Sequence, residues 1–336
     1  MVRPMTHESS SMTQLPDDRL LERIETLAVE LARGAGGILS RYFGASLSVE
    51  FKDDRGRDPV TNADTEAQDF LETGIRESFP EHGILGEEDD EDKAAEDEVA
   101  PDFLWVLDPL DGTKNFLHGL PVYASSVGVM YRGEPVVGAV FTPWPGSVSV
   151  NGVVHHARRG GGAFTDDEPI SALALDSPGA DQLITVPGAF DRLYRFGKPM
   201  RGNSGDPRVT GSIAYELVLV SRGVTQYMYT SNPHLWDIVG GVAVAMEAGS
   251  ALMVGQRSSG PMGLFPSIAW RESNALVEEW RQGNATLRDL RRWARPLILG
   301  SPPVAQFVSQ NMAWRRDPAL RLRFWWARRK RRRRER

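Results

Sequence analysis

Apolar residues recur at helical spacing near the start of the chain. After Asp17, which is suited to cap a helix, Leu, Ile and Ala side chains follow at intervals of three or four positions as far as Leu31. The spacing predicts a helix over residues 17–42. A second helix with an apolar inner face is expected to begin near Asn62 or Asp64.

Other segments have the period of strands or of buried helices. The alternating LSVEFK and the apolar FLWVLD and TQYMYT predict strands, and a hairpin is expected to turn at residues 132–134. GSIAYELVLVSRG predicts a buried helix, and so does WDIVGGVAVAMEAGS, which Gly249 closes as a left-handed cap. Residues 272–295 are expected to be helical, amphipathic and charged. This mixture of helices and strands predicts an α/β protein.

The same pattern divides the chain into two halves with an extension at each end. Hairpins are concentrated in the first half, so residues 17–165 are expected to be α+β and residues 166–300 to be α/β. Residues 1–16 are predicted to be a disordered leader, and residues 301–336 a basic, disordered tail.

The composition is that of a soluble globular protein. Of the 336 residues, 41% are hydrophobic and 25% are charged. No apolar run reaches the roughly 18 residues of a membrane span, and the N-terminus lacks the apolar core of a signal peptide. The chain has no cysteine, which excludes disulfides, thiolate metal sites and a cysteine nucleophile. We therefore expect a cytoplasmic protein.

The net charge of −6 hides an asymmetry along the chain. Residues 321–336 hold ten basic residues and one acidic residue, whereas the remainder holds 29 basic and 44 acidic residues. With its tryptophans, this tail could bind nucleic acid or an anionic membrane surface. We favour the simpler interpretation, a solvated extension, because such signals are compositional.

The segment WVLDPLDGTKNF carries the strongest chemical signal. Residues three apart on a regular strand face opposite sides, so Asp108 and Asp111 can converge only if the chain bends, and Pro109 between them predicts that bend. We expect Asp108 at the strand end and Asp111 in the turn. Gly112-Thr113 should then begin a loop or helix whose free N–H groups attract phosphate. Carboxylates beside an anion pocket suggest a bound Mg²⁺.

Alternatives exist for this segment and for three others. The D-x-D-G-T motif of haloacid-dehalogenase-type phosphatases has one residue between its aspartates, and a calcium loop needs D-x-[DN]-x-[DN]-G, so neither fits. The alternative without a function is that Asp108 and Asp111 are two solvent-exposed aspartates of a turn. Glu87 in ILGEEDD could belong to an acidic loop, Asp237 in HLWDIVGG could be a helix cap, and KDDRGRDPVTNAD could be a polar turn before a helix.

Together and in this order, the four segments resemble the inositol monophosphatase family. Its motifs are D-x-[VT]-T-x-[AT]-D, G-E-E, D-P-[IL]-D-G-T-x-N-F and W-D-x-[AV]-[AG]-G, and ARRGGGAF resembles its R-x-G-x-G-A-F stretch. The resemblance covers about residues 17–255. It implies a layered αβαβα sandwich of the inositol monophosphatase and fructose-1,6-bisphosphatase type. It also implies that two or more Mg²⁺ ions and a metal-activated water hydrolyse a small-molecule phosphomonoester.

The resemblance assigns roles to individual residues. The metal ligands would be Glu87, Asp108, the carbonyl of Leu110, Asp111 and Asp237. Most of them lie in the first half, and Asp237 from the second half completes the active site. Glu87 and Thr113 would orient and help deprotonate the attacking water, and Asp64 would assist through the Thr113 hydroxyl. The substrate would be held by Gly112, Thr113 and Asp237.

The substrate and the assembly are less sharply defined. Lys52 lies where the family often has a lysine near a weakly held metal, but Thr230 replaces a glutamate that often contacts the sugar hydroxyls. Fructose 1,6-bisphosphate, histidinol phosphate and 3′-phosphoadenosine 5′-phosphate therefore remain alternatives to an inositol phosphate. We expect a homodimer acting on a small phosphorylated metabolite. The alternative of another class is a non-catalytic scaffold that binds nucleic acid or membrane through the basic tail.

Overall fold

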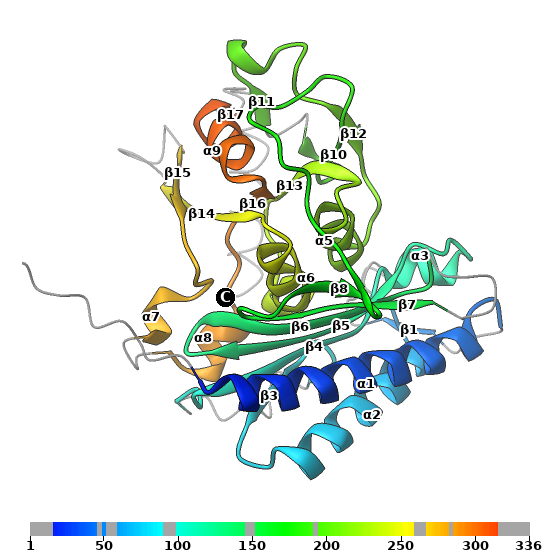
Figure 1. Cartoon of the computed structure of the whole chain (residues 1–336). Helices are drawn as coiled ribbons and strands as arrows, with labels where there is room; N and C mark the ends of the chain where they lie inside the picture. Colours follow the sequence, from blue (N-terminus) through cyan, green and yellow to red (C-terminus); the bar gives the residue numbers. More distant parts are fainter. Residues whose placement is uncertain are drawn as a thin grey trace, which may run out of the picture.

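The computed structural model describes residues 16–45, 49–51, 59–89, 99–144, 152–190, 194–258, 267–281 and 285–314. These residues form two large β-sheets and a set of helices arranged in layers (Figure 1). The helices are α1 (Asp18–Tyr42), α2 (Asn62–Ser78), α3 (Thr113–Leu117), the 3₁₀ turn η1 (Lys198–Met200), α5 (Ile213–Ser221), α6 (Leu235–Glu247), α7 (Glu278–Arg281), α8 (Leu287–Arg291) and α9 (Pro302–Asn311).

The first sheet belongs to the N-terminal half of the chain. Its seven strands, in spatial order, are β3 (Gly83–Gly86), β4 (Phe103–Asp111), β5 (Ala124–Tyr131), β6 (Glu134–Thr142), β7 (Val153–Arg158), β8 (Gly162–Thr165) and β9 (Glu168–Pro169). β3 and β4 pair in parallel, and each later neighbour pairs antiparallel. The hairpin between β5 and β6 turns at Arg132 and Gly133, as predicted.

The second sheet belongs to the C-terminal half. Its six strands, in spatial order, are β12 (Asp206–Arg208), β10 (Leu183–Thr185), β13 (Thr225–Thr230), β16 (Leu297–Gly300), β14 (Ala251–Ser258) and β15 (Ser267–Glu272). Two small antiparallel pairs accompany the sheets: β1 (Val49–Phe51) with β2 (Pro59–Thr61), and β11 (Tyr194–Phe196) with β17 (Met312–Trp314).

Helices and sheets alternate from one side of the molecule to the other. α1 and α2 cover one face of the seven-stranded sheet, α5 and α6 lie between the two sheets, and α9 lies against the six-stranded sheet (Figure 1). One apolar cluster fills the space between α1, α2 and the first sheet, and a second surrounds α6. This is the αβαβα sandwich that the sequence predicted.

The predicted first helix is confirmed, and its start has a local cause. The Asp17 side chain accepts a hydrogen bond from the Arg19 N–H (3.4 Å), which satisfies one of the free donors at the helix start. Leu21, Ile24 and Ala28 then recur on the buried face of α1. Their periodicity fixes which face of α1 packs on the first sheet.

Glycines let α6 lie directly against the first sheet. A Cβ at Gly138 would stand 2.0 Å from the Gly240 carbonyl oxygen, and one at Gly128 would stand 2.5 Å from the Gly240 nitrogen. Real Cβ atoms do not approach so closely, so only glycine fits at these points. Because Asp237 lies less than one turn before Gly240, this contact determines where the start of α6 meets the sheet.

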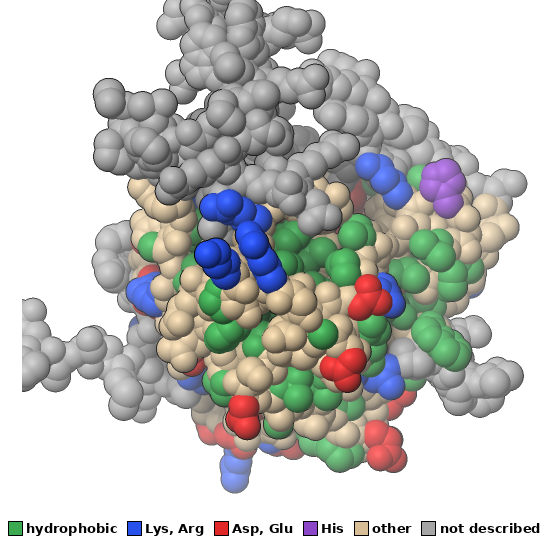
Figure 2. Space-filling model, turned by 90° about the horizontal axis from the view of Figure 1, so that it is seen from above, with side chains coloured by type: hydrophobic (Ala, Val, Ile, Leu, Met, Phe, Trp, Pro, Cys, Tyr) green, Lys and Arg blue, Asp and Glu red, His purple; other side chains and the backbone are tan. Residues whose placement is uncertain are grey.

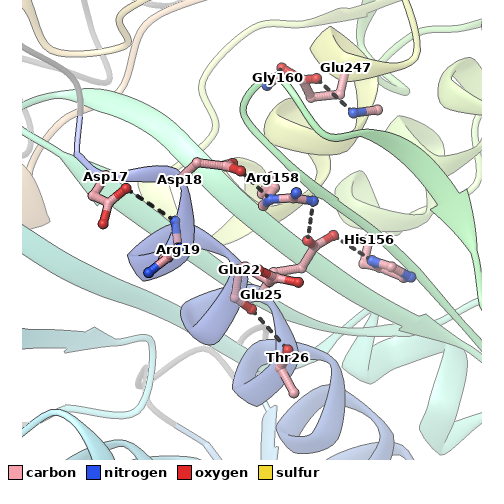
Figure 3. A network of polar contacts seen from close by, with 11 residues as sticks. Asp17, Asp18, Arg19, Glu22, Glu25, Thr26, His156, Arg158, Gly160 and Glu247 are labelled. Atoms are coloured by element: carbon pink, nitrogen blue, oxygen red, sulfur yellow. Dashed lines mark hydrogen bonds and ion pairs between the residues drawn. The ribbon is translucent and has the colours of Figure 1, made fainter.

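The other end of α6 is tied to the glycine-rich turn between β7 and β8. The Glu247 carboxylate accepts hydrogen bonds from the N–H groups of Gly160 (3.0 Å) and Gly162 (3.2 Å) (Figure 3). This turn is the ARRGGGAF stretch. That stretch therefore anchors α6 from the end opposite to Asp237.

Two expectations about the last part of the chain were wrong. The tail does not begin at residue 301, because residues 302–311 form α9, with Val304, Ala305 and Val308 buried. Residues 272–295 hold the short helices α7 and α8 instead of one long helical segment. The predicted start of the tail at residue 301 rested on composition. The short apolar repeat within residues 302–311 would have predicted α9 instead. The basic segment at 321–336 lies outside the described residues.

The visible surface is mixed in character. Figure 2 shows a small group of basic side chains, scattered acidic ones and apolar side chains between them on the upper face. In the part of the chain that the structure describes, no helix combines the length and the apolar character that a bilayer-spanning helix needs.

Candidate active site

The parallel pairing of β3 with β4 brings Glu87 beside Asp108. Gly86 lies opposite Leu107 in the ladder, and the Glu87 N–H donates to the Leu107 carbonyl (3.0 Å). Parallel strands leave the sheet at the same edge, so the residues that follow Gly86 and Leu107 are neighbours. Two carboxylates from separate sequence motifs therefore meet at one edge of the sheet.

A β-bulge turns Asp108 and Asp111 to the same side. Asp108 lies opposite Ser126 on β5 and Asp111 lies opposite Ala124, so three steps along β4 match two steps along β5. The extra residue reverses the alternation of side chains, and Pro109, which has no N–H for the ladder, lies within the bulge. The predicted bend is present. The prediction that the strand ends at Asp108 was wrong, because β4 continues to Asp111.

The backbone reverses direction directly after the bulge. Gly112 has φ = 91°, a left-handed conformation that favours glycine, and it is the residue before α3. The Thr113 hydroxyl donates to the Leu110 carbonyl (3.0 Å), and the Leu110 N–H donates to Asp108 Oδ1 (3.1 Å). The helix start expected at Gly112-Thr113 is thus confirmed.

Asp111 is also bound to the C-terminal half. Its Oδ2 accepts hydrogen bonds from the Ser212 hydroxyl (2.8 Å) and the Ala214 N–H (2.5 Å) at the start of α5. Ser212 caps that helix, and its Oγ accepts from the Tyr215 N–H (3.3 Å). Our sequence reasoning missed Ser212, although a serine before an apolar helical run is a recognised cap signal.

Asp237 enters the same region from α6. It lies in the first turn of this helix, and its Oδ2 accepts a hydrogen bond from the His234 N–H (2.7 Å). The interpretation of Asp237 as a helix cap is therefore correct in part. Burial raises the pKa of Asp237 and the negative charge of Asp111 raises it further, so Asp237 also lies near the carboxylates around β4.

The acidic side chains raise one another's pKa values. Burial raises the pKa of Asp108 well above its usual range, and the negative charges of Glu87, Asp111 and Asp237 raise it further. Burial likewise raises the pKa of Asp237 well above its usual value and that of Asp111 to about 7. Such shifts mean that burial and acidic neighbours both disfavour the charged carboxylates. Among the described residues, no ion pair joins Asp108, Asp111 or Asp237 to a cationic side chain.

Asp64 is close to this group but has a different partner from the one expected. It is 1% exposed and accepts hydrogen bonds from the Thr61 N–H (2.9 Å) and hydroxyl (2.5 Å) in the capping box of α2. Burial raises the pKa of Asp64 to about 6, and the charge of Glu87 contributes. The structure therefore brings Asp64 near Glu87 but pairs it with Thr61, while the Thr113 hydroxyl is turned to Leu110.

Glu216 is another carboxyl group that sequence reasoning missed. It lies on α5, 5% exposed, and accepts hydrogen bonds from the Thr210 N–H (3.0 Å) and hydroxyl (2.8 Å). Burial raises the pKa of Glu216 to about 7, and the charge of Asp111 adds to the effect. A single glutamate within an apolar helix was the available signal, because such a residue is rarely buried without a purpose.

The donor set suits a hard divalent cation. The groups gathered here are carboxylates and a backbone carbonyl, which are the oxygen ligands that Mg²⁺ prefers. In the conformation described, no three Asp, Glu or His side chains of the described residues converge on one point. Asp111 and Asp237 instead accept hydrogen bonds from neutral donors, as given above. Lys52, the expected cation near the site, lies outside the described residues.

Comparison with known proteins gives a consistent result. The model of the inositol monophosphatase family matches residues 20–291. The fructose-1,6-bisphosphatase/inositol-1-monophosphatase of Thermotoga maritima is 28% identical over 270 residues, which cover 80% of this chain and 94% of that protein. The histidinol-phosphatase of Chlorobaculum parvum is 29% identical over 230 residues, covering 66% of this chain and 82% of that protein.

The solved structures agree at the level of the fold. An inositol monophosphatase from Thermotoga maritima superposes with a TM-score of 0.61 at 24% identity, covering 86% of this chain and 96% of that chain. The predicted fold class is therefore confirmed, and the matches in sequence confirm the resemblance that the motifs indicated.

Proposed function

The chain belongs to the inositol monophosphatase family and is a phosphatase acting on phosphomonoesters, and from this premise we propose how its residues carry the reaction. The observation that carries the proposal is the group of carboxylates at the edge of the first sheet, of which Asp108 is buried and Glu87, Asp111 and Asp237 are half-buried. Burial raises the pKa values of Asp108, Asp111 and Asp237, acidic neighbours raise them further, and among the described residues no cationic side chain forms an ion pair with them. A buried acidic cluster of this kind is stable at neutral pH when a divalent cation balances it.

We propose that two or more Mg²⁺ ions are that cation. Their ligands would be the carboxylates of Glu87, Asp108, Asp111 and Asp237 and the carbonyl of Leu110. When bound, the ions would neutralise phosphate charge and lower the pKa of a water molecule. The same ligands come from the turn after β3, from β4 and from α6, so folding of both halves would complete the site.

The residues after the bulge would receive the substrate. The N–H groups of Gly112 and Thr113 follow Asp111 directly and would donate to phosphate oxygens, and Asp237 would contact the substrate from α6. Glu87 and Thr113 would orient the attacking water and accept its proton. Asp64 would assist through the Thr113 hydroxyl, which requires that hydroxyl to leave the Leu110 carbonyl.

The substrate is proposed to be a small phosphorylated metabolite. Thr230 is 5% exposed at the end of β13, and its short, neutral side chain cannot replace a carboxylate that accepts hydrogen bonds from sugar hydroxyls. Thr230 therefore gives no reason to prefer inositol phosphate over fructose 1,6-bisphosphate, histidinol phosphate or 3′-phosphoadenosine 5′-phosphate. We also propose a homodimer in the cytoplasm, which light scattering and cell fractionation test.

The decisive experiment is phosphate release from a panel of these four compounds, with Mg²⁺ and with EDTA. We expect Mg²⁺-dependent release from at least one. The absence of release from all four, together with absent Mg²⁺ binding by calorimetry, would favour the scaffold alternative. Deletion of residues 321–336 should leave turnover unchanged if the tail is a solvated extension.

A further inference from the structure

Arg291 holds the turn that carries Glu87. Its side chain is 11% exposed at the end of α8. The guanidinium donates to the carbonyl oxygens of Gly86 (2.9 Å), Glu87 (3.3 Å) and Asp89 (2.5 Å). Figure 1 shows α8 beside the sheet, about 200 residues after the turn it contacts. One cationic group thus replaces water at three carbonyl acceptors of this turn.

The same turn is fixed from the opposite side by α2. Gln68 Nε2 donates to Asp89 Oδ1 (2.8 Å), and Gln68 Oε1 accepts from the Glu88 N–H (3.0 Å). Asp89 Oδ2 accepts from the Gly86 N–H (2.7 Å). The main chain on both sides of Glu87 is therefore hydrogen-bonded, and Arg291 is the contact that comes from the C-terminal half.

Arg291 also contacts the residue before Asp237. Its guanidinium carbon lies 5.3 Å from the centre of the Trp236 ring, within the range of a cation–π interaction. The other partner of that ring is His234, with ring centres 4.5 Å apart and planes inclined by 5°. Trp236 is 9% exposed, so the stack is held by its surroundings.

We propose that Arg291 is a positioning residue that sets the separation between Glu87 and Asp237. A guanidinium suits this role because its planar fork donates in its plane while its face stacks on an aromatic ring. A lysine ammonium has only three donors and no planar face to stack on the ring. The inference rests on the proposed function, in which Glu87 and Asp237 hold Mg²⁺ together. Residues that support metal ligands typically contribute 10–100-fold to metal affinity or activity.

The test compares Arg291→Met and Arg291→Lys with Arg292→Met in the full-length protein. Arg292 is the adjacent, exposed arginine, which makes it a matched control. For Arg291→Met we expect kcat to fall by about 10–100-fold and the Mg²⁺ concentration for half-maximal activity to rise similarly. The KM for the phosphomonoester should change less than kcat, since Gly112 and Thr113, which would hold the phosphate, are untouched and only the contact from Asp237 would be affected. Arg291→Lys should recover only part of the loss, and Arg292→Met should match the wild type.

Two readouts do not depend on turnover. Mn²⁺ affinity by calorimetry should weaken in Arg291→Met, and amide hydrogen exchange should accelerate in the segment 86–89 while α1 remains protected. If Arg291→Met does not fold, the same measurements on Arg291→Lys decide the matter. Unchanged exchange, metal affinity and kcat in a folded Arg291 variant would overturn the inference. An inactive wild type that still shows faster exchange and weaker Mn²⁺ binding on substitution would refute the proposed reaction but not the positioning role.

Discussion

Two buried acidic residues, Glu25 on α1 against the first sheet and Asp108 within that sheet, differ in how their charge is balanced. Glu25 on α1 is 8% exposed and accepts from His156 Nδ1 (2.7 Å) and Arg158 Nη1 (3.2 Å), and Arg158 Nε also donates to Asp18 (3.2 Å) (Figure 3). Asp108 is 1% exposed, and the charged groups that act on its pKa are all acidic.

The difference distinguishes the contacts around Glu25, which hold α1 on the sheet, from the carboxylates around Asp108, which we propose bind metal ions. At Glu25 both partners belong to β7, the Arg158 guanidinium and the His156 imidazole, whose pKa the contact to Glu25 helps to raise, so these contacts join α1 to the sheet. At Asp108 the neutralising charge must be a proton or an external cation. A buried carboxylate without its own cation is thus a better guide to the site than a buried carboxylate alone.

Removing one negative charge from the carboxylates around Asp108 should have the largest effect on activity. Asp111→Asn keeps an acceptor for Ser212 and Ala214 but loses a proposed Mg²⁺ ligand, so activity should fall by at least about a hundredfold. The metal-free protein at pH 8 should melt at the same temperature or higher, because repulsion is relieved. Phosphate release and thermal unfolding measure the two effects. A variant that fails to fold would show that Asp111 is structural.

The dependence on Mg²⁺ and pH should be the next largest effect. Raised carboxyl pKa values stabilise the metal-free fold at low pH, and that contribution is lost as pH rises through about 7, the pKa of Asp111. At pH 8, Mg²⁺ at a hundredfold excess over Kd should therefore stabilise the protein by about 2.7 kcal/mol relative to the metal-free form, and the same Mg²⁺ concentration should stabilise it less at pH 6. Unfolding with Mg²⁺ or EDTA tests this, with K⁺ as the ionic-strength control. A larger gain at pH 6 would contradict the idea.

A substitution that alters no charge tests whether the position of α6, which carries Asp237, affects activity. Gly138→Ala places a methyl group against the Gly240 carbonyl, so α6 must shift, at a cost of about 1–3 kcal/mol in unfolding free energy. Activity should fall as well, because Asp237 moves with α6. The matched control is Gly37→Ala in α1, where a Cβ meets nothing within 4 Å and the helix should gain stability. Denaturant unfolding measures the free energy of unfolding of both variants. Equal values for Gly138→Ala and Gly37→Ala would refute the argument that only glycine fits against the Gly240 carbonyl.

A substitution among the residues around Glu25 should have the smallest effect on stability and none on activity. Burial alone lowers the pKa of His156, but hydrogen bonds to Glu25 and to the Asp166 carbonyl (2.9 Å) more than offset it, so the pKa is raised. That stabilisation is complete below pH 6.5 and is lost as pH rises through the folded-state value. His156→Asn should cost about 1 kcal/mol at pH 6 and less at pH 9, with activity unchanged. A loss that grew with pH would show that the imidazole is neutral in the fold.

Local pattern predicted much of the fold. α1, the start of α2, the β5–β6 hairpin, β13 and α6 were predicted from periods and caps, since these depend on residues near in sequence. The expectations about residues 272–295 and 301–311 failed, because short helices such as α7, α8 and α9 show too few repeats and are stabilised by tertiary packing.

The sequence by itself determined the family and the class of chemistry, and it predicted Glu87, Asp108, Asp111 and Asp237 as site residues, because each lies in a short motif. Only the tertiary structure decided how they are held. The bulge that aligns Asp108 with Asp111 depends on pairing with β5, and the Ser212 contact spans 101 residues. The Arg291 contact to the Glu87 turn spans 204 residues. Such contacts cannot be predicted from the periodicity of the sequence, because they form only when packing brings distant segments within hydrogen-bonding distance.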